Sequence, residues 1–323
     1  MKVSVIVLTY NQEDTISRTL DSILGQQVDF DYEIIVGDDA STDRTRQICT
    51  QYQQRYPERL RIMPQAPNKG VADNYFDCLE AARGEFIADC AGDDRWSDPL
   101  KMQRQVRFLE SHPEVALIHS AWRQVNAATG EPGDVTTMDF REITPGREVL
   151  LRVLRHDSPW PVHLCTATYR RAMMMAEYEA DKTLFRGRCA EDISVIAALA
   201  ASHPFGYERN VTLDYSVGGD SVSNPARATR AAGFYRGSLE LTGLLANKYG
   251  VGIGQIASGL RRVHSWALYL SILSGNSRML HELESVRRAI GLRPTMKSRL
   301  RHLLHRLSAR CGKHALPSPT DGA

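Results

Sequence analysis

The sequence has few of the features that mark secreted, membrane-spanning or zinc-binding proteins. Its six cysteines are scattered without a Cys-x-x-Cys pair or a Cys-His cluster, which argues against a disulfide framework and against a structural zinc site. No stretch approaches the ~20 consecutive apolar residues of a membrane-spanning helix. The apolar run at the N-terminus stops at Asn11, too early for a signal peptide. We therefore expect reduced thiols and a cytoplasmic location.

An excess of charge of one sign and a glycine-rich loop are missing as well. The 40 Lys and Arg residues nearly balance the 38 Asp and Glu residues, so the net charge of +2 does not argue for nucleic acid as a partner. The segment after Leu8 reads TYNQEDT, which is acidic and has no glycine. A sugar-1-phosphate nucleotidyltransferase needs a glycine-rich, basic loop there to hold a triphosphate, so this class is disfavoured. A phospho-acceptor receiver domain would leave most of the 323 residues unexplained.

The first half of the chain alternates apolar strands with amphipathic helices. Strands are predicted for the apolar, β-branched runs at 3–8, 32–37, 59–63, 85–89 and 114–122. This alternation predicts an α/β fold, with a mostly parallel sheet and helices on both faces. Further along, the pattern predicts a helix at 145–156, a strand at 163–169, a helix at 191–201, and short strands at 205–207 and 211–215.

From residue 226 to about residue 308 the pattern predicts helices alone. We therefore expect an α/β region at 1–225, with halves at 1–120 and 121–225, and a helical region at 226–323. The last predicted helix has Leu300, Leu303, Leu304 and Leu307 on one face, with basic residues at Lys297, Arg299, Arg301, Arg306, Arg310 and Lys313. A basic amphipathic helix suits an anionic membrane surface, and it equally suits docking on the protein core.

Polar clusters follow three of the predicted strands. They are Thr9-Tyr10-Asn11, Asp38-Asp39 and Asp93-Asp94. In parallel sheets, ligands bind at the carboxyl ends of strands, where these clusters would meet. Adjacent carboxylates repel each other unless a partner compensates them, and their hard oxygens suit Mg²⁺ or Mn²⁺. The alternative for Asp93-Asp94 is a solvated loop that leads to the helix cap at Asp98.

Two further acidic positions have both a structural and a functional interpretation. Asp39 could accept hydrogen bonds from a nucleobase or a ribose hydroxyl, or form a turn that leads to a helix cap at Asp43. Glu191 and Asp192 open an apolar helix. Acids in this position are often partners of the helix dipole, whereas a carboxylate that reaches an acceptor hydroxyl would be a general base.

Taken together, these motifs resemble family 2 glycosyltransferases of the GT-A fold. The closest pattern is that of the bacterial members that build surface polysaccharides. The resemblance is strong over residues 1–109, thinner to residue 223, and absent beyond. It is carried, in order, by VSVIVLTYNQEDTISRTLDSIL, EIIVGDDASTDRT, NKGVADNYFDCLEAARGEFIA, AGDDRWSDPLKMQRQVRFLE, HLCTATYRR and AEDISVIAALA.

The resemblance implies roles for the matching residues. A nucleotide-sugar-binding half would span 1–120 and an acceptor half 121–225. The nucleotide would lie against Thr9, Tyr10, Asn11, Asp39, Asn68, Gly70 and Asp93. Mn²⁺ or Mg²⁺ would be bound by Asp94, with Asp93 beside it. Asp192 would be the catalytic base, with Glu191 as the second candidate. Trp96 and His163 are expected on the acceptor side.

The implied activity is the inverting transfer of a sugar from a nucleotide-diphosphate sugar, most simply a UDP-sugar. The acceptor would be a hydroxyl of a bacterial surface glycan, often lipid-linked. Such an acceptor would make binding to the inner face of the membrane through the C-terminal helix useful. No nucleic-acid partner is implied.

Two departures from the family pattern bear on this interpretation. Many relatives carry an Asp where this chain has Ala91, and many carry Arg and His where it has Ser216 and Gly218. Candidates to replace the missing basic residues are His163, Arg188 and Arg209. The alternative function is a non-catalytic nucleotide-sugar-binding or scaffold paralogue.

Overall fold

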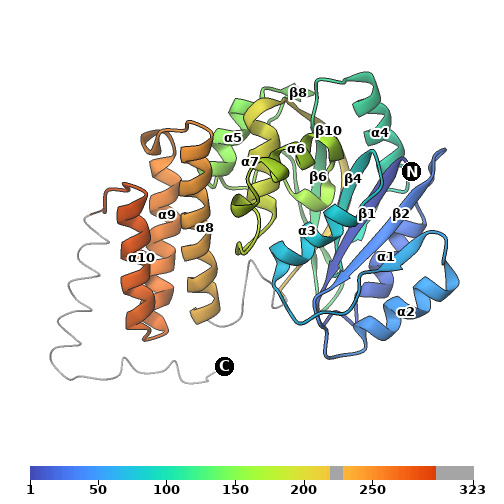
Figure 1. Cartoon of the computed structure of the whole chain (residues 1–323), viewed down its shortest axis with the longest axis horizontal. Helices are drawn as coiled ribbons and strands as arrows, with labels where there is room; N and C mark the ends of the chain where they lie inside the picture. Colours follow the sequence, from blue (N-terminus) through green and yellow to red (C-terminus); the bar gives the residue numbers. More distant parts are fainter. Residues whose placement is uncertain (219–227, 296–323) are drawn as a thin grey trace.

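The computed structural model describes residues 1–218 and 228–295, and these form one large sheet with helices around it and three helices beside it (Figure 1). The strands are β1 (Val3–Thr9), β2 (Tyr32–Asp38), β3 (Leu60–Ile62), β4 (Phe86–Ala91), β5 (Arg95–Trp96), β6 (Leu117–Asn126), β7 (Pro132–Thr136), β8 (Ile143–Thr144), β9 (Thr168–Arg170) and β10 (Phe205–Val217). The helices are α1 (Ile16–Leu24), α2 (Thr45–Arg55), α3 (Val71–Ala81), α4 (Lys101–Ser111), α5 (Gly146–Leu154), α6 (Arg171–Ala180), α7 (Asp192–Ser202), α8 (Ala228–Lys248), α9 (Ile253–Leu273) and α10 (Ser277–Ala289).

The strand order of the sheet is β3-β2-β1-β4-β9-β6-β10-β5, with β7 added to β6 and β8 added to β10. Strands β1 to β4 are parallel, and β10 runs parallel to β6. The short strand β9 lies antiparallel between β4 and β6. The mixed α/β architecture agrees with the α/β fold predicted from the alternation of strands and helices, and the parallel pairings expected there are those among β1 to β4 and between β6 and β10.

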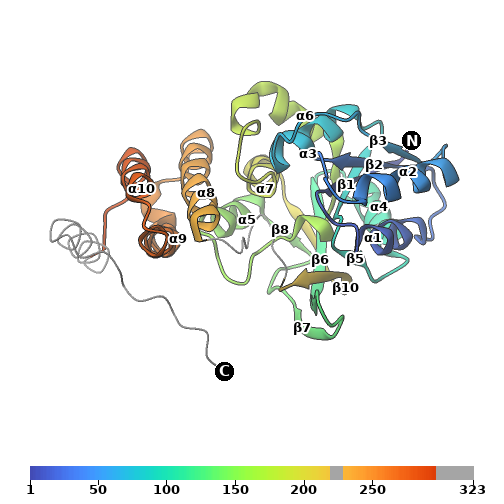
Figure 2. The same ribbon diagram turned by 90° about the horizontal axis from the view of Figure 1, so that it is seen from below.

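Helices cover both faces of the parallel part, as right-handed crossovers require. The chain moves from β1 to β2 and β3 in one direction, and then returns past β1 to β4. Consequently α1 and α2 lie on one face of the sheet and α3 lies on the other (Figure 2). Helix α1 buries Ile16, Leu20 and Ile23, which are three of the four apolar residues that recur at helical spacing in the sequence.

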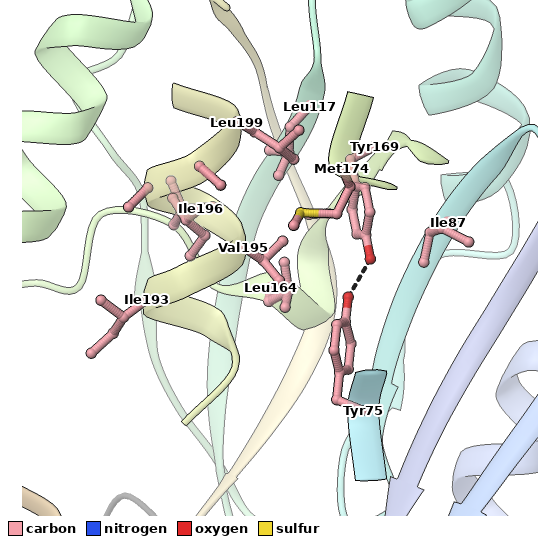
Figure 3. Close-up of a cluster of buried hydrophobic side chains, with 14 of the residues drawn as sticks. Tyr75, Ile87, Leu117, Leu164, Tyr169, Met174, Ile193, Val195, Ile196 and Leu199 are labelled. Carbon is pink, nitrogen blue, oxygen red and sulfur yellow. Dashed lines mark hydrogen bonds between the residues drawn. The ribbon is translucent and has the colours of Figure 1, made fainter. Parts of the chain in front are cut away.

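Helix α7 forms much of the core on the face that also carries α3. Its side chains Val195 and Leu199 point toward the sheet and lie near Leu164 and Leu117, whereas Ile193 points to the other side of the helix (Figure 3). The hydroxyl groups of Tyr75 and Tyr169 form a buried hydrogen bond in the same region (Figure 3). This packing holds the first residue of α7, Asp192, in a defined place.

Several predicted boundaries were wrong. The strand predicted at 163–169 is a 3₁₀ helix (Leu164–Thr166) followed by β9, and the strands predicted at 205–207 and 211–215 are parts of β10. The polar residues between them form an irregularity in the β6–β10 register, where the chain bulges without leaving the sheet. Helix α6 was not predicted, because it buries only Met174 and Tyr178 and has no continuous apolar stripe.

The helices α8, α9 and α10 pack against one another beside α5 and α7 (Figures 1 and 2). One polar contact to the α/β region joins Nε2 of His156 to the hydroxyl of Thr242 at 2.8 Å. The predicted boundary at residue 225 lies outside the described residues, as does the basic helix with Leu300 and Leu307. None of the described helices is long and apolar enough to cross a membrane.

Candidate active site

The loops after β1, β2 and β4 meet at one edge of the sheet. Leu8 in β1 pairs with Ala91 in β4, so these two strands end together. The N–H of Asp39 donates to the carbonyl of Thr9 at 3.0 Å, and the N–H of Gly92 donates to that of Leu8 at 2.8 Å. The three polar clusters predicted at strand ends are therefore neighbours in space.

Gly92 allows the first and third of these loops to approach closely. A Cβ atom at this position would lie 2.4 Å from Oε1 of Gln12 and 2.8 Å from Oγ1 of Thr9. Oγ1 of Thr9 is buried, and no residue in the described part of the chain forms a hydrogen bond with it. The buried hydroxyl of Thr9 thus lies beside Gly92, the residue that directly precedes the acidic pair Asp93-Asp94.

Asp94 is the more deeply buried member of the acidic pair, with 1% of the residue exposed. Its Oδ1 accepts a 3.0 Å hydrogen bond from the N–H of Ser216 in β10. Its Oδ2 is also buried and accepts no hydrogen bond of standard geometry from residues 1–218 or 228–295, although the nearby Cys165 thiol acts to lower the pKa of the carboxyl. One oxygen is thus held by a backbone N–H, and the other has no hydrogen bond of standard geometry from the described residues.

Burial raises the pKa of Asp94 well above its usual value, and the negative charge of Asp93 raises it further. The pKa of Asp93 is raised by burial too, although its side chain interacts with that of Gln12. Because the ionised pair is unfavourable by itself, a bound cation would stabilise both carboxylates.

The donor set of this acidic pair fits a hard divalent cation. Two carboxylates lie side by side, and Oδ2 of Asp94 has no donor among the described residues. Within residues 1–218 and 228–295, no group of three or more His, Cys, Asp and Glu side chains could by itself hold a metal ion. Mg²⁺ in particular is bound through one or two carboxylates and completes its shell with water and substrate phosphate. Asp94 and Asp93 could therefore hold such an ion together with a phosphate ligand.

Asp39 lies at the same edge, but its carboxylate is already engaged. Oδ1 accepts the N–H of Lys69 and Oδ2 accepts the N–H of Gly70, each at 2.9 Å. The side-chain amide of Asn68 donates to the Asp39 carbonyl at 2.8 Å. Gly70 has φ +88°, a conformation that glycine adopts readily. Asp39, Asn68 and Gly70 thus lie together, and the Asp39 carboxylate holds the loop that begins α3.

Tyr10 and Asn11 lie on the outer side of the same edge. Tyr10 is 48% exposed, so its ring is accessible to a ligand. Oδ1 of Asn11 accepts the N–H of Thr42 at 2.8 Å, and the N–H of Asn11 donates to the hydroxyl of Ser41 at 2.9 Å. These bonds join the loop after β1 to the loop after β2.

The start of α7 lies at this edge because of the topology. Strand β10 begins at Phe205, opposite the first residue of β6, so α7 must run from the carboxyl edge back to the amino edge. The segment before α7 is attached to the first turn of α3, where the N–H of Gly187 donates to Oδ1 of Asp73 at 3.0 Å. Asp73 follows closely on Gly70, so Asp192 begins its helix on the same side of the sheet as the loop held by Asp39.

Glu191 and Asp192 differ in their acidity. Burial raises the pKa of Glu191 to about 8, and the charge of Asp192 contributes to this shift. Burial raises the pKa of Asp192 to about 6, and hydrogen bonds from backbone N–H groups, led by that of Ile193, oppose the shift. Both carboxyls are therefore weaker acids than usual, and Asp192 is the stronger acid of this interacting pair. Its carboxylate is the form that could accept a proton.

The two residues expected on the acceptor side are packed differently. Trp96 is only 3% exposed, and its indole N–H donates to the carbonyl of Cys165 at 3.0 Å, as in a packing residue. His163 lies edge-on to Tyr215, with 4.5 Å between the ring centroids. Burial lowers the pKa of His163 to about 4, so the imidazole is neutral at physiological pH.

The residues proposed to replace the missing basic pair do not provide a charge beside Asp94. His163 is neutral, and the guanidinium of Arg188 donates to the carbonyl of Thr183. Arg209 lies in the bulge of β10, in the half of the strand away from Ser216. The basic residue that reaches the site is instead Arg18 of α1.

Arg18 was missed by the sequence analysis, which used α1 only for its apolar spacing. Next to the apolar stripe, Thr15, Arg18, Thr19 and Ser22 recur at spacings of three and four residues. The hydroxyls of Thr15 and Thr19 donate to the carbonyl of Gly92 at 2.9 and 3.0 Å. This polar stripe was the available signal that α1 contacts the acidic loop.

Comparison with known proteins supports the assignment of a family. Residues 4–174 match the family described as glycosyl transferase family 2. The uncharacterized protein Rv1520 of Mycobacterium tuberculosis is 46% identical over 114 residues, which is 35% of this chain and 33% of that protein. The UDP-Glc:alpha-D-GlcNAc-diphosphoundecaprenol beta-1,3-glucosyltransferase WfaP of Escherichia coli is 35% identical over 109 residues, 34% of this chain and 41% of that protein. The chain thus matches less than half the length of each relative.

Two solved structures share the fold. S. aureus TarS 1-349 in complex with UDP-GlcNAc has a TM-score of 0.57 at 20% identity, covering 100% of this chain and 95% of that one. The mannosyltransferase PcManGT from Pyrobaculum calidifontis, in complex with GDP-Man and Mn²⁺, has a TM-score of 0.52 at 18% identity, covering 97% and 88%. The architecture is that of the GT-A fold expected from the motifs, and the match over residues 4–174 covers more than half of the sequence. The chain therefore belongs to glycosyl transferase family 2.

Proposed function

We propose that this protein is an inverting, metal-assisted glycosyltransferase that moves a sugar from a nucleotide-diphosphate sugar to a hydroxyl of a bacterial surface glycan. The observation that carries the proposal is the buried acidic pair at the carboxyl edge of the sheet, with Oδ2 of Asp94 lacking a donor among the described residues. Asp192 begins its helix at the same edge. This reaction needs a cation at the leaving group and a separate base, and we assign these roles to the acidic pair and to Asp192.

The donor is proposed to be a UDP-sugar. The name of WfaP and the complex of TarS both contain a UDP-sugar, whereas PcManGT was solved with GDP-Man. Residues 1–120 would bind the nucleotide and residues 121–225 the acceptor. The nucleotide contacts are assigned to Thr9, Tyr10, Asn11, Asp39, Asn68, Gly70 and Asp93.

The proposed reaction divides the work between the two acidic positions. Mn²⁺ or Mg²⁺ held by Asp94 and Asp93 would stabilise the negative charge on the leaving diphosphate. Asp192 accepts the proton of the acceptor hydroxyl as the new bond to the anomeric carbon forms and the bond to the diphosphate oxygen breaks. Because the hydroxyl attacks from the side opposite the leaving group, the anomeric configuration inverts. Glu191, whose pKa is raised by burial and by the charge of Asp192, is the second candidate for the base.

The acceptor is proposed to be a lipid-linked or growing glycan, met at the inner face of the cell membrane. The name of WfaP contains a diphosphoundecaprenol acceptor, which supports this class. The basic segment with Lys297, Arg299 and Arg301 would attract anionic lipid, since each basic residue near such a surface contributes about 1 kcal/mol. Co-sedimentation with anionic liposomes should fall when these three residues are changed to Glu, and unchanged binding would remove the membrane part.

The central experiment is a thermal-shift screen of UDP, GDP and dTDP with and without Mn²⁺. We expect stabilisation by one of the three, UDP in the first instance, and only with the metal. Release of UDP from UDP-GlcNAc or UDP-Glc then tests for chemistry. The Asp192→Asn variant should still be stabilised by UDP but should release none. Stabilisation without any turnover of a donor would favour the non-catalytic alternative, and no stabilisation by any nucleotide would contradict the proposal.

A further inference from the structure

Arg18 connects α1 to both the acidic loop and the end of the last strand. Its Nη2 donates to the carbonyl of Asp93 at 2.8 Å and to the hydroxyl of Ser216 at 3.2 Å. The hydroxyl of Ser216 in turn donates to the Asp93 carbonyl. Arg18 therefore places a basic side chain next to Ser216, the position at which many relatives carry Arg.

The charge of Arg18 acts on both members of the acidic pair. It acts against burial, so the pKa of Asp93 and that of Asp94 are raised less than they would be without Arg18. Its contacts are to a carbonyl and a hydroxyl, so the guanidinium is not neutralised by an ion pair with either carboxylate. A full positive charge is therefore available beside the acidic pair.

The guanidinium also has unused donors. Its hydrogen bonds within residues 1–218 and 228–295 involve Nη2 alone. Arginine has five N–H groups in a planar fork, which matches the oxygens of a phosphate group. Because the residue is exposed at the surface of α1, its remaining N–H groups at Nε and Nη1 are accessible to a ligand.

The backbone that carries Arg18 is held against the acidic loop. The hydroxyl of Thr19 donates to the carbonyl of Asp94 at 2.6 Å and to that of Gly92 at 3.0 Å. Thr15, one turn before, donates to the same Gly92 carbonyl at 2.9 Å. The two residues on either side of Arg18 thus keep its position relative to the acidic pair fixed.

We propose that Arg18 binds the diphosphate of the nucleotide-sugar donor beside the cation site, taking the place of the basic residues absent at Ser216 and Gly218. This inference rests on the proposed function. A leaving diphosphate carries more negative charge than one divalent ion neutralises once two carboxylates bind that ion. A guanidinium at this point supplies the missing positive charge and binds phosphate oxygens through charge-assisted hydrogen bonds.

The test compares the binding of a diphosphate and a monophosphate to the full-length protein by titration calorimetry with Mn²⁺ present. UDP and UMP share the base and the ribose and differ in the second phosphate. The variants are Arg18→Gln and Arg18→Lys, with Arg44→Gln as the matched control. Arg44 pairs with Glu13 near the same edge, and its side chain is 73% exposed. Thermal unfolding of each variant shows whether it is folded.

Removal of a hydrogen bond to a charged group should weaken UDP binding by about 10-fold to about 100-fold in Arg18→Gln. UMP binding should change much less, and Arg44→Gln should match the wild type for both ligands. Arg18→Lys should retain part of the affinity, because it keeps the charge and loses the fork. UDP binding to Arg18→Gln should also depend less on salt concentration than binding to the wild type.

If the wild type binds UDP, either of two results would overturn this inference and leave the proposed function intact. Equal losses for UDP and UMP would mean that Arg18 only supports the Asp93 backbone. Unchanged UDP binding in Arg18→Gln would mean that the side chain does not meet the diphosphate. If the wild type binds neither UDP, GDP nor dTDP with Mn²⁺, the proposed function fails, and the role of Arg18 fails with it.

Discussion

The backbone N–H of Ser216 donates a 3.0 Å hydrogen bond to Oδ1 of Asp94, across 122 residues of sequence. The last strand of the sheet thereby orients the carboxylate that the family resemblance assigns to the metal. The bond engages one oxygen, and the other is left buried without a standard hydrogen bond from the described residues. Such an arrangement is unfavourable for the ligand-free protein and favourable for cation binding, since the carboxylate needs no reorientation.

Replacing Asp94 with Asn should separate binding from stability. The amide cannot ionise, so the variant has no charge at this buried position and no repulsion from Asp93. Burial and this repulsion are the two causes that raise the pKa of Asp94. We expect Mn²⁺ affinity, measured by calorimetry with UDP present, to fall by about 100-fold or more, because even indirect partners of a metal contribute 10- to 100-fold. The melting temperature of the ligand-free protein at pH 8 should stay the same or rise.

Asp98→Asn is the matched control for this change. Asp98 lies four residues further on, pairs with Arg104 at 2.6 Å, and accepts the N–H of Leu100 near the start of α4. Asn can still accept the N–H of Leu100, so the change removes mainly the ion pair with Arg104 and should lower stability by less than about 1 kcal/mol, with Mn²⁺ affinity unchanged. Equal Mn²⁺ affinities for Asp94→Asn and the wild type would exclude Asp94 as a metal ligand.

The acidity of the Glu191-Asp192 pair predicts the pH dependence of transfer. The base must be ionised, and the pKa of Asp192 is raised to about 6 by burial. The rate constant kcat/KM should therefore rise as the pH increases through about 6. The pKa of Glu191 is raised to about 8, so we expect a second titration at higher pH. Because the two groups interact, the profile reports values for the pair.

The single variants assign these two titrations. Glu191→Gln should keep the rise near pH 6 and lose the change near pH 8, whereas Asp192→Asn should lose transfer at every pH, by about 10² to 10⁴-fold. If Asp192→Asn retained transfer and Glu191→Gln lost it, the base would be Glu191. Circular dichroism of both variants, which lie at the start of α7, checks that the helix still forms.

Much of the edge at which β1, β2 and β4 end could be predicted, because it depends on local rules. Buried parallel strands appear in a sequence as continuous apolar runs, and their carboxyl ends lie at one edge of the sheet. The proximity of Thr9, Asp39 and Asp94 could therefore be predicted from the sequence alone. Asp43 was predicted as a cap. The N-cap of α2 is instead the next residue, Arg44, although the Asp43 carboxylate accepts the N–H of Thr45 at 2.9 Å.

The parts that sequence analysis missed depend on long-range contacts. Arg18 is an ordinary exposed helix residue until α1 is packed against the loop at Asp93. Likewise, the Asp39 carboxylate looked available to a ligand until the loop at Lys69 and Gly70 was seen to donate to it. Trp96 lies beside a motif and is nevertheless a packing residue, because burial depends on the whole fold.

Two buried acids should make opposite contributions to the pH dependence of stability. Asp89 in β4 is 5% exposed, and neither carboxyl oxygen accepts a standard hydrogen bond from residues 1–218 or 228–295. Burial raises its pKa well above 3.8, so the folded state favours the protonated form, and this stability is lost as the pH rises above 3.8. Relative to wild type, Asp89→Asn should gain melting temperature between pH 5 and about pH 8.

Glu33 provides the comparison of opposite sign. The pKa of Glu33 is lowered to about 2 because hydrogen bonds from Arg83 and Ser4 outweigh the effect of burial. Its stabilisation is present above 4.5 and is lost as the pH falls toward about 2. Glu33→Gln should cost on the order of 3 kcal/mol at neutral pH, and the difference should shrink below pH 4.5. Parallel pH profiles for the two variants would contradict both assignments.

Gly92→Ala should damage the acidic site more than the fold. The new Cβ would lie 2.4 Å from Oε1 of Gln12, which can rotate away, and 2.8 Å from Oγ1 of Thr9, which is fixed at the end of β1. The loop that carries Asp94 must therefore shift, and overpacking of this kind costs about 1–3 kcal/mol. Gly133→Ala is the control, because its Cβ would have no neighbour closer than 3.5 Å among the described residues. We expect Gly92→Ala to lose Mn²⁺-dependent UDP binding at temperatures where it is still folded. If it bound UDP like Gly133→Ala, the close contact between these loops would not be needed to form the site.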